Sequence, residues 1–374
     1  MDKIVISGTG VFTPEESITN KELVKAYNTY ADIYNSTNKS DISQGNKVAL
    51  ELSSEEFIYK ASGIKNRYVM DKTGILDPNI MHPVLKKRSN DEPSFLAEMS
   101  LKAAKKAMEN AGKTSNDIDV VITACSNLER AYPAVSIEVQ ELLGIKGFAF
   151  DMNVACSSAT FAIQAAADMI KSGSAKTILI VDPEICSGHL DFKDRDCHFI
   201  FGDVCTAMIL EKKETAKSNN TFEILSTKCI TQFSNNIRNN FGFLNNAKKS
   251  ASLDRDLLFM QEGRKVFKEV IPMVSQLITS HLEEEKIKIE EIKRLWLHQA
   301  NKSMNDFIGK KVLGRVPEDH EQPNILQDYA NTSSAGSIIA FSFYSEDMKN
   351  DEIGVLCSFG AGYSAGSIIL KKIS

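Results

Sequence analysis

The sequence has little of what marks fibrous, disordered or disulfide-stapled chains. Its 374 residues include 20 Gly, 9 Pro and one Trp, and 43% of them are hydrophobic. A globular chain of this length buries enough apolar surface to be stable without disulfides. Long apolar runs are missing too, because stretches such as 177–181 and 338–343 are far shorter than the ~20 residues of a membrane-spanning helix. The sequence therefore predicts a globular protein with no membrane span.

An excess of one charge sign is also missing. Lys and Arg number 44, Asp and Glu number 49, and the formal net charge is −5 with both signs interspersed. This balance argues against nucleic acid or an anionic membrane as the main partner. The seven cysteines are an odd and scattered set, and residues 1–14 contain no basic region followed by a long apolar stretch. We therefore expect a reducing, cytoplasmic compartment.

What the sequence does have is an alternation of short β-rich runs and amphipathic stretches. Strands are expected at 3–7 and 120–124, and helices at 94–111 and 136–143. This alternation is typical of α/β proteins, in which helices cover the faces of a sheet.

The chain also resembles itself. A helix, an acidic linker and a strand that ends in a polar motif occur twice, as DIDVVITACSN at 117–127 and as EEIKRLWLHQAN at 290–301. Each copy is followed by a turn rich in small residues that opens an apolar helix, and then by two closing strands. We therefore predict two similar halves, 1–213 and 223–374. Polar segments near 29–54 and 73–91 are predicted to be insertions in the first half.

Cys156 stands directly before a strongly helical stretch, 157–171, and follows an apolar strand and the turn 153–155. The N-terminus of a helix favours a thiolate, and the end of a strand exposes it, so the position suits a nucleophile. A single cysteine is more often inert packing in a core. Position alone therefore leaves both interpretations open.

His298 ends the predicted strand 295–297, and Asn331 ends the turn before the helix that starts at 333. By the internal repeat, these turns and the turn with Cys156 follow equivalent strands, whose ends gather at one face of an α/β sheet. We therefore expect the three side chains to converge. For His298, the alternative is a core imidazole that is hydrogen-bonded to backbone.

Four motifs, VACSSA, WLHQAN, YANTSSAG and SFGAGYSAGSIIL, occur in this order. With them the chain resembles β-ketoacyl-ACP synthase III, within the thiolase superfamily, over residues 4–370. The segments SGIKNRYVMDKTGILDP, SNLERAYPA and QFSNNIRNNFGFLN resemble in particular the subclass that accepts medium-chain acyl primers, typified by β-ketodecanoyl-ACP synthase. The resemblance implies an α/β, thiolase-like fold in which two similar βα halves form a layered α-β-α-β-α core.

The resemblance further implies an acyltransferase of fatty acid biosynthesis. Cys156 matches a nucleophile that takes an acyl primer, such as octanoyl, from acyl-CoA. Malonyl-ACP is then decarboxylated, and its carbanion attacks the acyl-enzyme to give 3-oxoacyl-ACP. His298 and Asn331 match the pair that holds the malonyl thioester oxygen, where neutral donors stabilise the developing enolate without quenching it. No cofactor and no metal are implied.

The surroundings of the nucleophile are implied as well. The backbone N–H groups of Cys156 and Ala361 match the oxyanion hole, and Phe359 matches an aromatic ring beside the malonyl carboxylate. The family often has Gly where Ala361 stands, so the backbone angle there has to be one that Ala can adopt. Phe201 and Tyr132 match residues of the acyl pocket. Tyr132 matches an aromatic that crosses a dimer interface, so we expect a homodimer.

The resemblance also implies that three residues bind CoA or the pantetheine arm of the carrier protein. Asn301 matches a pantetheine contact, and Arg195 matches an arginine that stacks on the CoA adenine, with Phe57 as its aromatic partner. Ala61 and Ser303 stand where short-chain members have cations, so contacts to the CoA phosphates are expected to be weaker.

Three lysines, Lys268, Lys310 and Lys311, match a basic docking surface for the acidic acyl carrier protein. Solvated helix lysines are the alternative interpretation of the same residues.

Other chemistries fit less well. A zinc site from Cys186, His189, Cys197 and His198 has an unusual ligand spacing. The GTG at 8–10 lacks the third glycine of a dinucleotide loop, so we expect a tight turn there. Papain-like hydrolases also use Cys, His and Asn, but their local sequences differ and two half-repeats are not expected in them.

Two further functions stay open. A thiolase-superfamily enzyme with another second step, such as polyketide starter formation, head-to-head condensation or ester formation, would keep acylation of Cys156 without malonyl-ACP. A non-catalytic acyl-carrier binding protein would form no adduct at all.

Overall fold

The computed structural model describes residues 3–247 and 255–374. In these residues, nine strands form one mixed sheet in the order β11-β12-β13-β8-β1-β7-β6-β4-β5. Their bounds are β1 Ile4–Phe12, β4 Val120–Ala124, β5 Phe148–Met152, β6 Thr177–Ile185, β7 Asp203–Lys212, β8 Phe222–Ser234, β11 Ile292–Leu297, β12 Ile353–Gly360 and β13 Gly362–Lys372. Two small ribbons pair β2 (Glu16–Thr19) with β3 (Asn66–Val69) and β9 (Ile237–Arg238) with β10 (Met260–Gln261).

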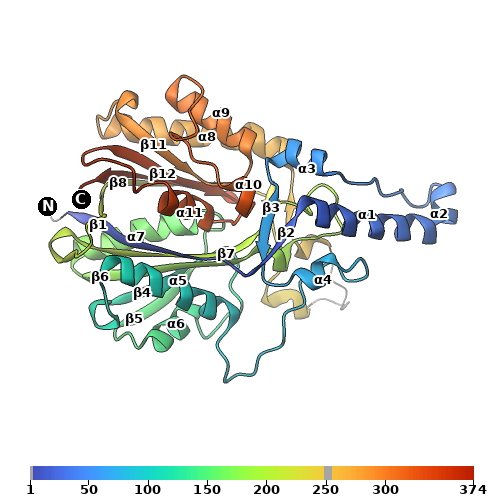
Figure 1. Cartoon of the computed structure of the whole chain (residues 1–374), viewed down its shortest axis with the longest axis horizontal. Helices are drawn as coiled ribbons and strands as arrows, with labels where there is room; N and C mark the ends of the chain where they lie inside the picture. The colour runs from blue at the N-terminus through green and yellow to red at the C-terminus, as the bar shows by residue number, and fades with distance from the viewer. Residues whose placement is uncertain (1–2, 248–254) are drawn as a thin grey trace.

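Helices and strands are stacked in five layers (Figure 1). Helices α5 (Phe95–Ala111) and α6 (Val135–Leu143) cover the outer face of β4, β6 and β7. Helices α7 (Ser158–Ser172) and α11 (Ala335–Phe343) pack between the strands of the two halves and form the central core. Helices α8 (Gly263–Glu284) and α9 (Lys302–Leu313) cover the outer face of β11, β12 and β13. The fold is thus the predicted α-β-α-β-α arrangement.

Few backbone pairs connect the two sides of the sheet at its middle, where β1 lies beside β8. Strands β1 and β8 are paired only at Val5 with Glu223 and at Ile6 with Phe222. On one side of this junction lie only strands from residues 1–213, and on the other only strands from residues 222–374. We propose from this order that the two halves expected from the internal repeat are two copies of one βα unit.

The helices begin and end where the sequence provides caps. The hydroxyl of Ser94 accepts the N–H of Ala97 at the start of α5, and Gly112 ends that helix with a φ of 64°. The predicted helix at 94–111 is therefore confirmed almost to the residue. The predicted strand at 3–7 is too short, because β1 continues to Phe12.

The GTG at 8–10 lies inside strand β1, so the predicted tight turn is wrong. A Cβ on Gly8 would collide with the backbone of Ala107, and a Cβ on Gly10 with that of Ala103. The glycines are needed because helix α5 crosses β1 at very close range.

The polar segment near 29–54 is partly helical. Helix α1 (Asn20–Thr37) runs well into it, followed by α2 (Lys39–Ser43), and together they form an arm that projects from the body (Figure 1). The loop that follows leads to α3 (Glu55–Ser62). The segment near 73–91 holds most of α4 (Lys72–Leu76) and then an extended loop. A capping box between Thr19 and Glu22 starts α1, which is why the chain becomes helical before the polar stretch begins.

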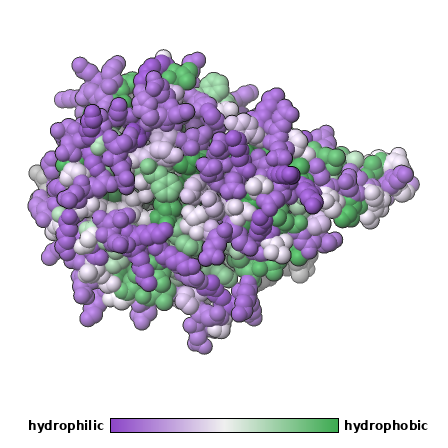
Figure 2. All heavy atoms as spheres, in the orientation of Figure 1, coloured by the Kyte–Doolittle hydropathy of each residue, from purple (hydrophilic) through white to green (hydrophobic). Residues whose placement is uncertain are grey.

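The face shown in Figure 2 is mostly hydrophilic, with apolar atoms interspersed along the projecting arm. Ile33 and Val48 of the arm are 48% and 84% exposed. Among the helices of residues 3–247 and 255–374, none has the length and apolar character needed to cross a bilayer. The short helix α10 (Leu326–Tyr329) completes the set and leads into the turn before α11.

Candidate active site

Cys156 lies in a tight turn between strand β5 and helix α7. The side-chain oxygen of Asn153 accepts the N–H of Ala155, and the N–H of Val154 donates to the hydroxyl of Ser158. Ala155 has a φ of 47°, a conformation that few side chains adopt without support. The turn therefore holds Cys156 directly before α7, where the sequence predicted it.

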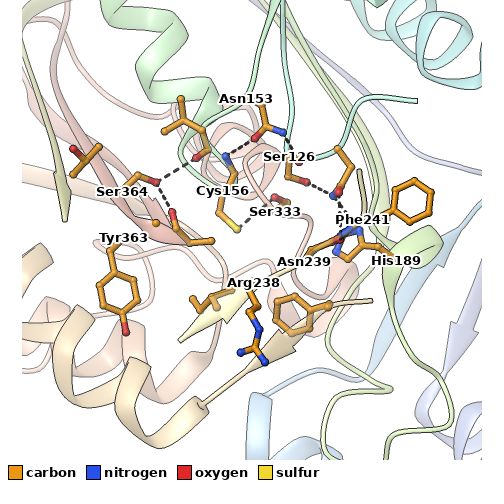
Figure 3. Close-up of a pocket in the computed structure, with 18 of the residues that line it drawn as sticks. Ser126, Asn153, Cys156, His189, Arg238, Asn239, Phe241, Ser333, Tyr363 and Ser364 are labelled. Carbon is orange, nitrogen blue, oxygen red and sulfur yellow. Dashed lines mark hydrogen bonds between the residues drawn. The ribbon is translucent and has the colours of Figure 1, made fainter. Parts of the chain in front are cut away.

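The Cys156 thiol is surrounded by hydrogen-bond donors. The hydroxyl of Ser333 donates to its sulfur at 3.4 Å, and Figure 3 shows the sulfur pointing toward Ser333. Burial raises the pKa of the thiol to about 11, and the hydrogen bonds from Ser333 and from the N–H groups of Ala361 and Cys156 oppose that rise. At neutral pH the thiol is therefore protonated, and desolvation outweighs the stabilisation of the thiolate expected from the helix N-terminus.

The N–H groups of Cys156 and Ala361 thus both face the sulfur. Ala361 is not among the described non-glycine residues with a positive φ, and the unusual φ of 130° belongs to Gly362. An alanine therefore fits at position 361. Gly360 is a residue that the sequence reasoning missed. A Cβ there would lie 2.9 Å from the sulfur of Cys156.

His298 follows strand β11 and is 2% exposed. Its N–H donates to the carbonyl of Cys357 at 2.7 Å, and the amide of Asn305 donates to its carbonyl. The imidazole stands at 90° to the ring of Phe359, with 5.2 Å between the centroids. Burial lowers the pKa of His298 to about 4, so the imidazole is neutral at ordinary pH.

Asn331 is held by its backbone and by its own side chain. Its N–H donates to the carbonyl of Ile200, and its carbonyl accepts the N–H of Gly202. Its side-chain oxygen accepts the N–H of Ser333 at 2.9 Å. This bond leaves the amide nitrogen as the part of the side chain that is free to donate to a ligand.

The three predicted catalytic residues meet in one cavity of about 350 Å³, which we call the front cavity. Its walls combine residues of both halves, among them Cys156, Phe201, His298, Asn301, Asn331 and Phe359. Phe201 and Phe359 are 3% and 2% exposed, so their rings form a dry floor. The turns that carry Cys156, His298 and Asn331 therefore converge, as expected.

A second cavity of about 630 Å³ also has Cys156 in its wall (Figure 3), and we call it the proximal chamber. Phe201, Ile237 and Phe259 line both cavities together with Cys156. Cys156 is therefore shared by the two cavities.

The residues expected to bind the carrier arm lie near the front cavity. Asn301 caps α9, and its amide donates to the carbonyl of Ala61 at 2.6 Å. The guanidinium of Arg195 lies 4.0 Å from the ring centroid of Phe57 and donates to the carbonyl of Leu52. The two planes are in direct contact, which leaves no gap for a purine between them.

The expected docking lysines lie on the outer helices. Lys268 is an exposed residue of α8, and Lys310 and Lys311 are exposed in the last turn of α9. Tyr132 lies elsewhere, in the loop before α6, and is 85% exposed. It lines a cavity of about 1000 Å³ with the loop at 85–95, so within one chain it does not reach the front cavity.

The four residues of the imagined zinc site do not form a metal cluster. Nδ1 of His198 donates to the carbonyl of Arg195, and its ring stacks on Tyr27, whereas His189 contacts the amide of Asn127. In residues 3–247 and 255–374, no group of three or more His, Cys, Asp or Glu side chains is placed to hold a metal ion.

A buried pair of acids behind the site was not predicted. Burial raises the pKa of Glu184 to about 7 and raises that of Asp182 as well. The hydroxyl of Ser334 donates to both carboxyl groups, and Ser126 donates to Glu184 through its N–H and its hydroxyl. Nothing in the local sequence indicates these contacts, because the partners are 58–152 residues apart.

Known proteins are similar to this chain over most of its length. Models described as 3-oxoacyl-ACP synthase III and as its C-terminal part match residues 150–232 and 282–372. The chain is 58% identical to β-ketodecanoyl-ACP synthase of Pseudomonas aeruginosa, over 93% of this chain and 100% of that one. It is 28% identical to β-ketoacyl-ACP synthase III of Clostridium perfringens, over 99% and 100% of the two chains.

Solved structures agree on the fold. The crystal structure of 3-oxoacyl-ACP synthase III from Aquifex aeolicus has a TM-score of 0.76 to this structure, at 24% identity, and covers 98% of this chain and 99% of that one. The chain therefore belongs to the β-ketoacyl-ACP synthase III family, the condensing acyltransferases of fatty acid synthesis, and has their thiolase-like fold.

Proposed function

We propose that this chain joins a medium-chain acyl primer, such as octanoyl from acyl-CoA, to malonyl-ACP and releases 3-oxoacyl-ACP. The observation that carries the proposal is the meeting of Cys156, His298 and Asn331 in the front cavity. The relative at 58% identity, which is named for a ten-carbon product, supports the medium chain length.

In the first step, the sulfur of Cys156 attacks the carbonyl carbon of the primer thioester. The bond from that carbon to the carrier sulfur breaks, and the thiol proton of Cys156 ends on the carrier sulfur. The N–H groups of Cys156 and Ala361 stabilise the oxyanion of the tetrahedral intermediate.

In the second step, the malonyl group loses CO2, and the electron pair of the broken bond forms an enolate on the remaining thioester. The enolate carbon attacks the acyl carbon, a carbon–carbon bond forms, and Cys156 leaves as a thiolate that takes a proton from water. His298 and Asn331 donate to the enolate oxygen, and Phe359 gives the departing carboxylate an apolar surface.

The tautomer of His298 supports this role. In the described residues its Nδ1 is buried without a hydrogen-bond partner. A buried N–H without an acceptor is more costly than an unused lone pair, so the proton belongs on Nε2. Nε2 then donates, as the side-chain amide of Asn331 does.

Residues outside the front cavity support proposals for carrier binding and for assembly. We propose that the CoA adenine stacks on the outer face of Arg195, since its inner face is covered by Phe57. Lys268, Lys310 and Lys311 dock the acyl carrier protein. For a homodimer, the supporting features are the edge position of β5 in the sheet and the exposure of Tyr132.

We also propose a reducing, cytoplasmic site of action. All seven cysteines lie in the described residues and all are free thiols. Such a set is typical of proteins that are kept reduced.

The function is tested by intact-protein mass spectrometry with acyl-CoAs from acetyl to dodecanoyl, followed by a chase with malonyl-ACP. Cys156→Ala serves as the blank. The expected result is an adduct that is greatest at medium chain length and that leaves as 3-oxoacyl-ACP with release of CO2.

Other results contradict the proposal in distinct ways. An adduct confined to acetyl indicates an initiating enzyme of the ordinary kind, and one that persists through the chase indicates another acyl transfer. Absence of any adduct, from acyl-CoA and from acyl-ACP alike, indicates a non-catalytic binding protein.

A further inference from the structure

The proximal chamber adjoins another cavity, and polar residues line the boundary that the two share. This third cavity, of about 300 Å³, is lined mainly by apolar side chains, and we call it the distal chamber. Four residues line both chambers: Asn127, His189, Asn239 and Phe241. We call the three polar ones, Asn127, His189 and Asn239, the collar. An acyl chain that extends from Cys156 into the distal chamber passes the collar.

The hydrogen bonds of the collar have a fixed direction. The backbone N–H of Phe241 donates to the side-chain oxygen of Asn239, so the amide nitrogen of Asn239 must face the other way. That nitrogen donates to the oxygen of Asn127 at 3.3 Å. The amide nitrogen of Asn127 in turn donates to Nδ1 of His189 at 3.0 Å. His189 therefore accepts at Nδ1 and carries its proton on Nε2.

The other end of the network gives the same direction. The hydroxyl of Ser126 donates to Glu184 at 2.5 Å, so it can only accept from the amide nitrogen of Asn127, at 3.0 Å. The two ends of the network thus agree that the amide nitrogen of Asn127, and not its oxygen, faces His189. Burial lowers the pKa of His189 to about 4, which keeps this imidazole neutral.

The collar leaves donors without acceptors. Within the described residues, no acceptor contacts Nε2 of His189 or the second amide hydrogen of Asn239. Rings of Phe201 and Phe259 pack against the imidazole, with centroids 5.1 and 6.2 Å away, so its ring faces are apolar. A saturated chain at the collar would leave the donors desolvated and unpaired, which is unfavourable.

We propose that the acyl primer carries an oxygen substituent, a hydroxyl or an oxo group, at the depth of the collar, where it accepts a hydrogen bond from His189 Nε2. This inference rests on the proposed function and narrows its substrate class. The oxygen is internal to the chain, because the distal chamber beyond the collar is lined by Leu85, Leu96 and Ile185 and accepts an apolar tail. A terminal carboxylate does not fit, since the collar is neutral and the guanidinium of Arg238 points away from it (Figure 3).

The test compares acylation rates of the full-length protein with octanoyl-CoA and with its hydroxy and oxo isomers at carbons 3 to 7. Intact-protein mass spectrometry follows the adduct on Cys156. One isomer is expected to acylate at least ~10-fold faster than octanoyl-CoA, because a site built to hydrogen-bond an oxygen discriminates against the analogue that lacks it. His189→Phe, which keeps a ring but has no donor, is expected to abolish that ratio.

Two more variants make the test specific. Asn239→Leu breaks the network that orients His189 and is expected to reduce the ratio as well, so the test does not depend on the folding of one variant. Arg238→Met changes the wall of the proximal chamber outside the collar and is expected to keep the ratio.

Equal or faster acylation by octanoyl-CoA than by every oxygenated isomer overturns the inference, as does a preference that survives in both His189→Phe and Asn239→Leu. The proposed function fails separately. Octanoyl transfer followed by condensation, without any preference, leaves the function standing and the inference refuted. If an oxygenated isomer acylates Cys156 faster than octanoyl-CoA but malonyl-ACP then releases no CO2, the inference stands and the proposed function is refuted.

Discussion

Gly360 lies against the nucleophile so closely that any side chain there would overlap it. A Cβ built on Gly360 comes within 2.5 Å of the Cβ of Cys156 and 2.9 Å of its sulfur. Real Cβ atoms do not approach one another at that distance, and neither partner can withdraw, since Gly360 is in β12 and Cys156 is fixed by its turn. The glycine therefore sets where the thiol stands.

Gly360→Ala is expected to lower the rate of acylation of Cys156 by at least ~100-fold, because the added methyl group displaces the sulfur from its donors. The rate is measured by mass spectrometry with octanoyl-CoA. Gly242→Ala is the matched control, since a Cβ there meets nothing within 4 Å. Normal acylation in Gly360→Ala would show that the turn can shift without cost.

Ser333→Ala is expected to raise the pKa of the Cys156 thiol further, since the hydroxyl of Ser333 is the largest of the contacts that lower it. The readout is the pH profile of alkylation by iodoacetamide, followed on Cys156 by mass spectrometry. The profile should move to higher pH, and acylation at pH 7 should slow by about tenfold. An unchanged profile would mean that Ser333 does not donate to the sulfur in solution.

His298→Ala and Asn331→Ala are each expected to keep acylation but to reduce decarboxylation of malonyl-ACP by roughly 10²–10³-fold, the usual effect of removing one oxyanion donor. Release of CO2 from the preformed acyl-enzyme measures the step. Cys156→Ala differs in losing acylation itself. Normal condensation in either of the first two variants would refute the roles assigned to these residues.

Condensation on the preformed acyl-enzyme is expected to be independent of pH between about 5.5 and 7.5. His298 has a pKa of about 4, so it is already neutral at the lower limit and becomes charged only as the pH falls through 4. Stopped-flow or quench measurements across that range test it. A fall in rate below pH 6.5 would indicate an imidazole with an ordinary pKa and hence a wetter cavity.

The buried acids predict how stability depends on pH. The pKa of Glu184 is raised from 4.5 to about 7 by burial, so the folded state binds a proton that the unfolded state releases at lower pH. This contribution is fully present below pH 4.5 and is lost as the pH rises toward 7. The Glu184 contribution to the free energy of unfolding in urea should therefore be lost between about pH 4.5 and 7. Buried histidines such as His189 and His298, whose pKa values are lowered to about 4, contribute the opposite dependence below pH 6.5, so the Glu184 contribution is measured as a difference from a variant.

Glu184→Gln is expected to remove this contribution, so the unfolding free energy of the wild-type chain should decrease relative to that of the variant as the pH rises from about 4.5 to 7. Asp203, whose pKa burial raises to about 6, contributes equally to both chains. An unfolding free energy with the same pH dependence in the variant and in the wild-type chain would show that Glu184 is ionised in the folded protein at all these pH values.

Much of the fold was predictable because the sequence signals are local. The cap at Ser94, the apolar period of α5 and the glycine at 112 lie within 19 residues of one another and determine that helix together. Strand β12, one of the closing strands expected in the second half, is a continuous buried run, which is also a local signal. The convergence of Cys156, His298 and Asn331 followed from the internal repeat.

The remaining features depend on contacts between distant segments. Asn127 meets Asn239 across 112 residues of sequence, and Ser333 meets Cys156 across 177. Asn127, Asn239 and Ser333 are by themselves ordinary polar loop residues, so no local pattern distinguishes them. The glycines at 8–10 were misinterpreted for the same reason, since the helix that requires them comes about 100 residues later.

The narrow junction between β1 and β8 has a consequence for how activity can be assembled. Cys156 belongs to one side of that junction, and His298 and Asn331 belong to the other, while only two residue pairs join β1 and β8 across it. Cleavage in the exposed link at 213–220 would thus yield two fragments, neither of which holds a complete site. If condensation recovers when the two fragments are mixed, the rate of condensation measures how well the two halves dock.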